Sequence, residues 1–129
     1  MTRVTGVGGV FIRAKDQARL SDWYKTHLGI DSGQWGAVFQ WDPPKAGEEP
    51  GCTAWNIFKP ESPYFPIEQR VMINYRVADL RALIAALRAE GCTVDDKVDE
   101  SEYGKFGWVT DPEGNRIELW EPPKANTPG

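Results

Sequence analysis

The residues of this chain that could perform chemistry are few, and their spacing excludes most common mechanisms. His27 is the only histidine, and nothing in the spacing of Cys52 and Cys92, the two cysteines, suggests a metal knuckle or a redox pair. The glycine-rich stretch at residues 6–9 precedes a predicted strand and does not join a strand to a helix, so it is not a dinucleotide-binding loop. No nucleophile–base pair or zinc motif appears either, and acid–base chemistry by a carboxylate, Glu118, is the possibility considered below.

The composition argues against nucleic acid and membranes as binding partners. The chain has 129 residues, which is enough for a single domain with a real core, and we place that domain over residues 1–129. Its net charge of −4 argues against nucleic acid, because phosphate binding requires a surplus of Lys and Arg. No apolar run approaches the roughly 20 residues that span a bilayer, so no membrane partner is expected. The first residues lack the pattern of a signal peptide, which predicts a cytoplasmic location.

The candidate carboxylate must be positioned by secondary structure, and the chain contains one arrangement of elements twice. Residues 9–16 match residues 72–79 at an offset of 63, which places Arg13 on Arg76. Apolar residues alternate with others in both segments, as in a strand with one buried face. Each half therefore begins with a predicted strand of the same design.

A helix is predicted after each of these strands. Asp16 and Asp79 can cap the two helices, since a carboxylate accepts hydrogen bonds from the free N–H groups of the first turn. Gly29 and Gly91 supply the stops at the other ends. The two helices are thus one element used twice.

Each half also closes with a strand that ends at proline. Residues 53–60 match residues 115–122 at an offset of 62, so that Asn56 corresponds to Glu118. Further strands are predicted at residues 37–41, 93–98 and 106–110. The predicted fold class is α+β, with two β-α-β-β-β modules at about residues 4–60 and 70–122 and a linker at residues 61–69.

These halves resemble the modules of the vicinal oxygen chelate superfamily, which includes glyoxalases, bleomycin-resistance proteins and extradiol dioxygenases. The residues that carry the resemblance span nearly the whole chain: Lys15-Asp16, Trp23-Tyr24, residues 27–29 (HLG), Tyr103-Gly104 and residues 111–122 (DPEGNRIELWEP). The resemblance implies that the modules form an open mixed β-barrel with the helices outside and a cleft within. It reports the fold far better than the reaction.

The resemblance also locates a metal site, and this chain departs from it. Catalytic members hold a divalent metal on four side chains, usually two histidines and two carboxylates. The corresponding positions are Gly9, Asn56, Met72 and Glu118, and only Glu118 is a good ligand for such a metal. His27 cannot substitute, because it lies on a predicted helix at core-facing spacing. We therefore expect no metal and no other cofactor.

Strand alternation predicts which side chains face the cleft. The predicted ligand-binding residues are Phe11, Arg13, Asn56, Phe58, Asn74, Arg76 and Trp120, with Tyr103 in a nearby loop. A mainly apolar cleft with a few convergent polar groups is typical of a small-molecule site. The alternative is a barrel closed by its own aromatic side chains, in which Arg76 and Glu118 form a structural pair.

The leading functional hypothesis is a small-molecule-binding protein without a metal, like the drug-sequestering members of the superfamily. One alternative is a metal-independent enzyme of the lyase or isomerase type, with Glu118 as general acid or base. Others are a metal-dependent lyase or dioxygenase with an atypical site, and an interaction module with a vestigial cleft. The resemblance further implies a homodimer, in which each chain closes its own barrel or the halves are exchanged.

Overall fold

A computed structural model describes residues 2–33, 36–41 and 51–123 of the chain. Within these ranges the chain has two helices and eight strands, and each helix follows a strand and is followed by further strands. The elements are β1 (Val4–Arg13), α1 (Gln17–Leu28), β2 (Ala37–Gln40), β3 (Cys52–Phe58), β4 (Val71–Val77), α2 (Leu80–Ala89), β5 (Thr93–Val94), β6 (Asp99–Ser101), β7 (Gly104–Thr110) and β8 (Arg116–Glu121).

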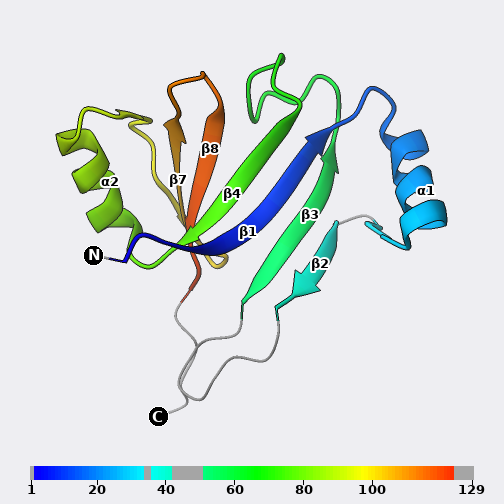
Figure 1. Cartoon of the computed structure of the whole chain (residues 1–129), viewed down its shortest axis with the longest axis horizontal. Coiled ribbons are helices and arrows are strands. Elements are labelled where there is room, and N and C mark those ends of the chain that lie inside the picture. The colour runs from blue at the N-terminus through cyan, green and yellow to red at the C-terminus, as the bar shows by residue number, and fades with distance from the viewer. Residues whose placement is uncertain (1, 34–35, 42–50, 124–129) are drawn as a thin grey trace, which may run out of the picture.

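The strands form one mixed sheet in the order β2-β3-β1-β4-β8-β7-β5, with β6 also paired to β7. The first strands of the two halves, β1 and β4, are antiparallel neighbours at its centre. Each of them is flanked by the last strand of its own half in parallel register, β3 beside β1 and β8 beside β4. Figure 1 shows this curved sheet with α1 and α2 at its two ends. The described sheet is open, because β2 and β5 end the path without pairing to each other.

Both helices cover the same face of the sheet. Val10 packs in the cluster under α1, and its partner across the β1–β4 ladder is Ile73. Side chains of directly opposed residues point to one face, and Tyr75, two residues after Ile73, packs in the cluster under α2. We call the opposite side, which carries no helix, the inner face.

The helix limits follow the predicted caps. Asp16 accepts a hydrogen bond from the N–H of Arg19, and Asp79 accepts one from the N–H of Ala82. Gly29 ends α1 in the left-handed region at a φ of 70°, where a side chain would be strained. Neither helix of the described part is long and apolar enough to cross a membrane.

The repeat seen in the sequence reappears in the register of the strands. Phe11 pairs with Asn56 between β1 and β3, and Asn74 pairs with Glu118 between β4 and β8. The offsets of 63 and 62 residues relate these two pairs. Of the strand predicted at residues 93–98 only β5, residues 93–94, is a strand, and an unpredicted short strand, β6, follows at residues 99–101; both pair with β7. In the first half, the described residues between α1 and β3 hold β2 alone.

The linker between the halves is fastened by one buried arginine. Arg13 is 6% exposed, and its guanidinium donates hydrogen bonds to backbone carbonyls of the segment that connects β3 to β4. These carbonyls belong to Lys59, Pro60, Ser62, Phe65, Pro66 and Gln69. A planar group with five donors suits such a cage, because each bond forms without further ordering of the side chain. The linker is therefore held against the end of β1.

Candidate ligand site on the inner face

The register places one row of side chains across the inner face. Glu118 of β8 is opposite Asn74 of β4 on one side and Trp108 of β7 on the other. Asn74 is in turn opposite Gly9 of β1. Because paired residues share a face, Glu118, Asn74 and Trp108 all point away from the helices. The prediction that Glu118 turns inward thus agrees with the strand pairing.

Glu118 is the centre of this row, and its carboxylate is almost fully buried at 2% exposure. The Nδ2 of Asn74 donates to Oε1 at 2.6 Å, and the indole Nε1 of Trp108 donates to Oε2 at 3.0 Å. The hydroxyl of Tyr64 also donates to Oε2. Three neutral donors therefore hold the buried carboxylate, which offsets much of the cost of removing it from water.

This arrangement corrects the predicted partner of Glu118. Arg76 was the partner considered from the sequence, but the amide of Asn74 takes that place. Arg76 lies opposite Trp120 in the β4–β8 ladder, and its guanidinium sits over the ring of Trp41 at 5.6 Å. The physical reason is register: Asn74 is directly opposite Glu118, whereas Arg76 is two residues further along the strand.

Asn74 carries an unusual feature. Its side chain is 3% exposed, and its Oδ1 has no hydrogen-bond partner, the sole such buried side-chain atom in the described part of the chain. The oxygen points at the backbone of Gly8, where a Cβ would lie only 2.4 Å from it. A buried acceptor without a partner costs free energy. Asn74 Oδ1 could therefore accept a hydrogen bond that is not formed in this structure.

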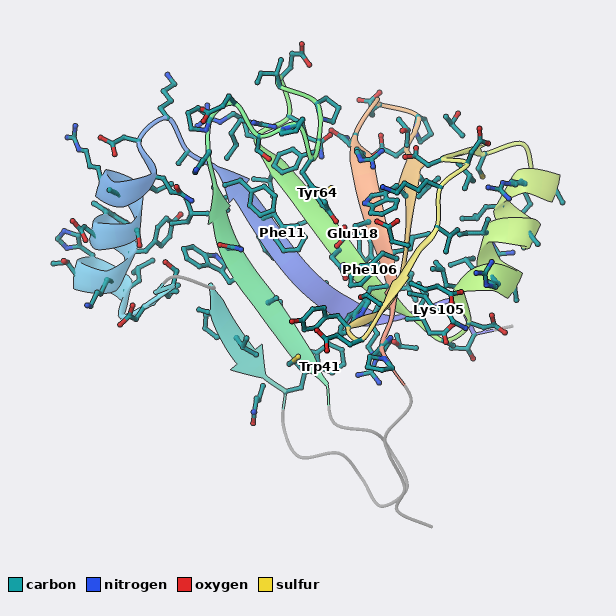
Figure 2. All side chains as sticks on the ribbon, turned by 180° about the vertical axis from the view of Figure 1, so that it is seen from behind. Phe11, Trp41, Tyr64, Lys105, Phe106 and Glu118 are labelled. Carbon is teal, nitrogen blue, oxygen red and sulfur yellow. The ribbon has the colours of Figure 1, made fainter. Side chains whose placement is uncertain are left out.

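Tyr64 comes from the linker and covers Glu118 from outside the sheet. Its side chain is 38% exposed, while its hydroxyl reaches the carboxylate (Figure 2). Burial, followed by the charge of Glu118 and the hydrogen bond to it, raises the pKa of the Tyr64 hydroxyl well above its ordinary value. The phenol therefore stays protonated and serves as a donor throughout the neutral range.

Aromatic rings surround this polar centre. The ring of Phe58 lies 5.3 Å from that of Phe11, 5.7 Å from Tyr64 and 5.6 Å from Phe65. Tyr64 in turn contacts Trp108 edge-on at 6.2 Å. Such contacts add to the stabilisation from buried area and leave a largely apolar wall beside the carboxylate.

The other end of the inner face combines a cation with indole rings. Trp41 packs over bare glycine backbone, since a Cβ on Gly6 would meet its ring at 2.2 Å. Trp120 lies over Gly8 in the same way and stacks with Phe106 at 6.4 Å. The glycines of β1 are needed here because any side chain would collide with these rings.

The family's four metal positions do not fit a divalent ion in this chain. Gly9 has no side chain, Met72 is fully buried and carries only a thioether, and the Oδ1 of Asn56 accepts the N–H of Ile57. Both oxygens of Glu118 are already bonded to neutral donors. In the ranges that the structure describes, no three His, Cys, Asp or Glu residues come together as a metal site would require.

The predicted ligand-binding residues separate into groups. Asn74 bonds Glu118, Phe11 and Phe58 belong to the ring cluster that reaches Glu118 through Tyr64, and Arg76 and Trp120 lie further along the inner face. Arg13 points to the linker and bonds its carbonyls. Asn56 and Phe58 line a cavity of about 480 Å³ at the exposed end of β3. Tyr103 is 68% exposed, and its backbone carbonyl accepts the indole N–H of Trp120.

Sequence reasoning missed three residues of this face. Trp108 could have been found, because alternation in the strand at residues 106–110 puts Phe106 and Trp108 on one side. Trp41 follows β2 directly and reaches Thr53, whose hydroxyl accepts its indole N–H at 2.9 Å. Tyr64 has no such signal, since it lies in a linker without periodicity.

The structure is an open mixed α+β sheet, with both helices on one face and a buried carboxylate on the other. The chain belongs to the glyoxalase-like domain family, whose model matches residues 9–120. No curated protein matches the chain in sequence.

Solved structures share the fold at low sequence identity. Methylmalonyl-CoA epimerase from Mycobacterium tuberculosis is 22% identical, with a TM-score of 0.63 over 95% of this chain and 91% of that one. The Streptomyces coelicolor methylmalonyl-CoA epimerase, in complex with 2-nitronate-propionyl-CoA, is 17% identical, with a TM-score of 0.67 over 97% and 99%. A Legionella pneumophila structure described as NAD-dependent benzaldehyde dehydrogenase is 15% identical, with a TM-score of 0.58 over 89% and 98%. At these identities the likeness concerns the fold alone.

Proposed function

We propose that this protein binds a small organic molecule on the inner face of the sheet, against Glu118, without a metal ion. The observation that carries the proposal is the Glu118 carboxylate, buried among aromatic rings and bonded only by neutral groups. A group so costly to bury is seldom placed in an apolar wall for stability alone, since a packed apolar residue serves stability as well or better.

Tyr64 gives the ligand a route to this carboxylate. Its side chain is partly exposed and belongs to the linker, whereas Asn74 and Trp108 are buried in strands. Rotation of the Tyr64 ring would free one acceptor position on Glu118 Oε2, which Trp108 still contacts, and would open the aromatic wall, while Arg13 keeps the linker backbone in place. A ligand with an N–H or O–H donor next to an aromatic or aliphatic body matches the groups exposed by that movement.

A thermal-shift screen of small aromatic and heteroaromatic compounds would test the proposal, with hits titrated by tryptophan fluorescence. Glu118→Gln should weaken binding of a hit at least tenfold, because an uncharged amide is a poorer acceptor. The matched control is Glu113→Gln, an exposed carboxylate on the turn before β8. Equal affinity of both variants for every hit would contradict the assignment of the site to Glu118.

A second candidate is a metal-independent enzyme of the isomerase type. The observation that favours it is the contact between the Tyr64 hydroxyl and Glu118, which pairs a proton donor with a carboxylate in a desolvated site. Glu118 would take a proton from a C–H bond next to a carbonyl, and the carbanion would be reprotonated from the same site.

Because methylmalonyl-CoA epimerases share the fold, methylmalonyl-CoA is a reasonable first substrate. Incubation in D2O should then replace the hydrogen at the acidic carbon by deuterium, as followed by NMR. Glu118→Gln should abolish this exchange. Absence of exchange with the wild-type protein would leave the binding function as the proposal.

The proposal also includes the absence of a bound metal, a homodimeric assembly and a cytoplasmic location. Elemental analysis of purified protein should find no stoichiometric zinc, nickel, iron or manganese, whereas about one metal per chain, lost on Glu118→Ala, would contradict this. We expect a homodimer of 14.5 kDa chains in the cytoplasm. Light scattering that gives the mass of one chain at working concentration would refute the dimer.

A further inference from the structure

Another cavity lies beside α1, on the side of the sheet that carries the helices, and is separate from the site around Glu118. It has a volume of about 330 Å³ and lies between the end of β1, the first turn of α1 and the start of β4. Its apolar surface comes from Ala14, Leu20 and Trp23. Trp23 is 49% exposed, which is unusual for so large an apolar side chain and leaves one side of the ring open.

The remaining walls of this cavity are strongly basic. Lys15, Arg19 and Arg70 line it, and their side chains make no ion pair or hydrogen bond with any residue that the structure describes. Asp16 is the one acidic residue of the lining, and its carboxylate accepts the N–H that begins α1. Three unpaired cations around an apolar floor are unexpected in a chain of net charge −4.

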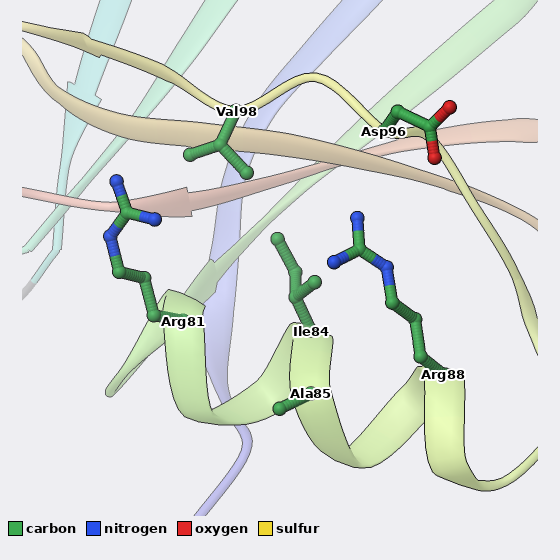
Figure 3. Close-up of a pocket in the computed structure, with 6 residues that line it drawn as sticks. All are labelled: Arg81, Ile84, Ala85, Arg88, Asp96 and Val98. Atoms are coloured by element: carbon green, nitrogen blue, oxygen red, sulfur yellow. The ribbon is translucent and has the colours of Figure 1, made fainter.

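The cavity beside α2 also contains cationic side chains, but these are paired. That cavity, of about 360 Å³, also contains two arginines, Arg81 and Arg88 (Figure 3). Arg81 forms an ion pair with Glu100, and Arg88 donates to the carbonyl of Asp95. The two α2 arginines therefore form contacts within the protein, whereas the cationic side chains beside α1 form no comparable contacts with described residues.

We infer that the cavity beside α1 binds an organic anion, in which a carboxylate or phosphate group is joined to a flat apolar body. The anionic group contacts Lys15, Arg19 and Arg70, and the apolar body packs on Trp23 and Leu20. A guanidinium recognises both carboxylate and phosphate by paired hydrogen bonds, and two arginines are present. The inner-face ligand is a separate molecule, so this site stands independently of the function proposed above.

The test uses phenyl phosphate as the probe and the side-chain Nε1–H signal of Trp23 as the readout in NMR, assigned with Trp23→Phe. Phenyl phosphate should shift this signal saturably. The double variant Arg19→Gln/Arg70→Gln should weaken binding about tenfold, because each exposed charge contributes a fewfold. The matched control, Arg88→Gln/Lys97→Gln, removes the same charge elsewhere and should bind within twofold of wild type. All four positions are exposed, so these variants should fold.

The two parts of the ligand are tested by two further probes. Benzyl alcohol, which lacks the charge, should not shift the Trp23 signal at tenfold higher concentration. Inorganic phosphate should bind at least tenfold more weakly than phenyl phosphate. The inference is overturned if phenyl phosphate gives no saturable shift, if the control variant loses as much affinity as the site variant, or if either probe binds as well as phenyl phosphate.

Discussion

Replacement of Glu118 by alanine and by glutamine should have very different effects on stability. In the alanine variant, Asn74 Nδ2 and Trp108 Nε1 lose their acceptor while they stay buried. Each orphaned donor costs about 1–3 kcal/mol, so the two together predict a loss of about 2–6 kcal/mol, to which a small cavity adds. Tyr64 is partly exposed, and its hydroxyl can turn to water.

Glutamine can satisfy the same groups. Its carbonyl oxygen can accept from Tyr64 and Trp108, and its amide N–H can donate to Asn74 once the Asn74 amide rotates by half a turn. This rotation uses Asn74 Oδ1, the acceptor that has no partner at present. The Asn74 amide N–H then takes the position without a partner, so the number of unpaired groups is unchanged and only the stronger hydrogen bonds to a charged acceptor are lost. We therefore expect Glu118→Gln to cost about 1 kcal/mol, less than the alanine variant.

Equilibrium urea unfolding, followed by tryptophan fluorescence, measures both variants, with Glu113→Ala and Glu113→Gln as controls expected within about 0.5 kcal/mol. A double-mutant cycle adds Trp108→Phe, which should cost less stability in the Glu118→Ala background than in wild type, because one orphaned donor is removed. If glutamine destabilises as much as alanine, or alanine costs less than about 1 kcal/mol, the hydrogen-bond account of Glu118 is wrong.

Three other predictions follow from the same contacts. Gly8→Ala should lose about 1–3 kcal/mol in urea unfolding, because its Cβ would lie 2.4 Å from Asn74 Oδ1 and 2.9 Å from the Trp120 ring, whereas Gly114→Asn, in an open turn, should be tolerated. Arg13→Lys should lose about 2–4 kcal/mol and expose the linker to limited proteolysis, since an ammonium group has three donors for the carbonyls that the guanidinium now serves. Stability should fall above about pH 10, where tyrosine ionises in the unfolded chain while Tyr64 in the folded chain stays protonated; Tyr64→Phe should remove this component of the alkaline titration, and an unchanged profile would contradict it.

Local signals in the sequence predicted both helices and the long strands of this fold. Asp16 and Asp79 cap the helices as their spacing predicts, because capping involves only the next few residues. Strand alternation likewise separated the helix-covered face from the inner face, since the direction of a side chain depends on its place in the strand alone. The family was suggested by the resemblance of the two halves and of motifs such as residues 111–122, and it is shown by the match over residues 9–120.

Partners across the sheet and over the linker were decided by tertiary structure. Glu118 is bonded by Asn74 and not by Arg76, because the register of β4 against β8 is set by the packing of the whole sheet. Tyr64 reaches the site because Arg13, at the far end of β1, holds the linker by its carbonyls, and no periodicity in residues 61–69 encodes that. Alternation predicts the face of a residue within a strand, because that depends on local geometry; the contacts between strands, and those made by the linker, depend on the folded chain.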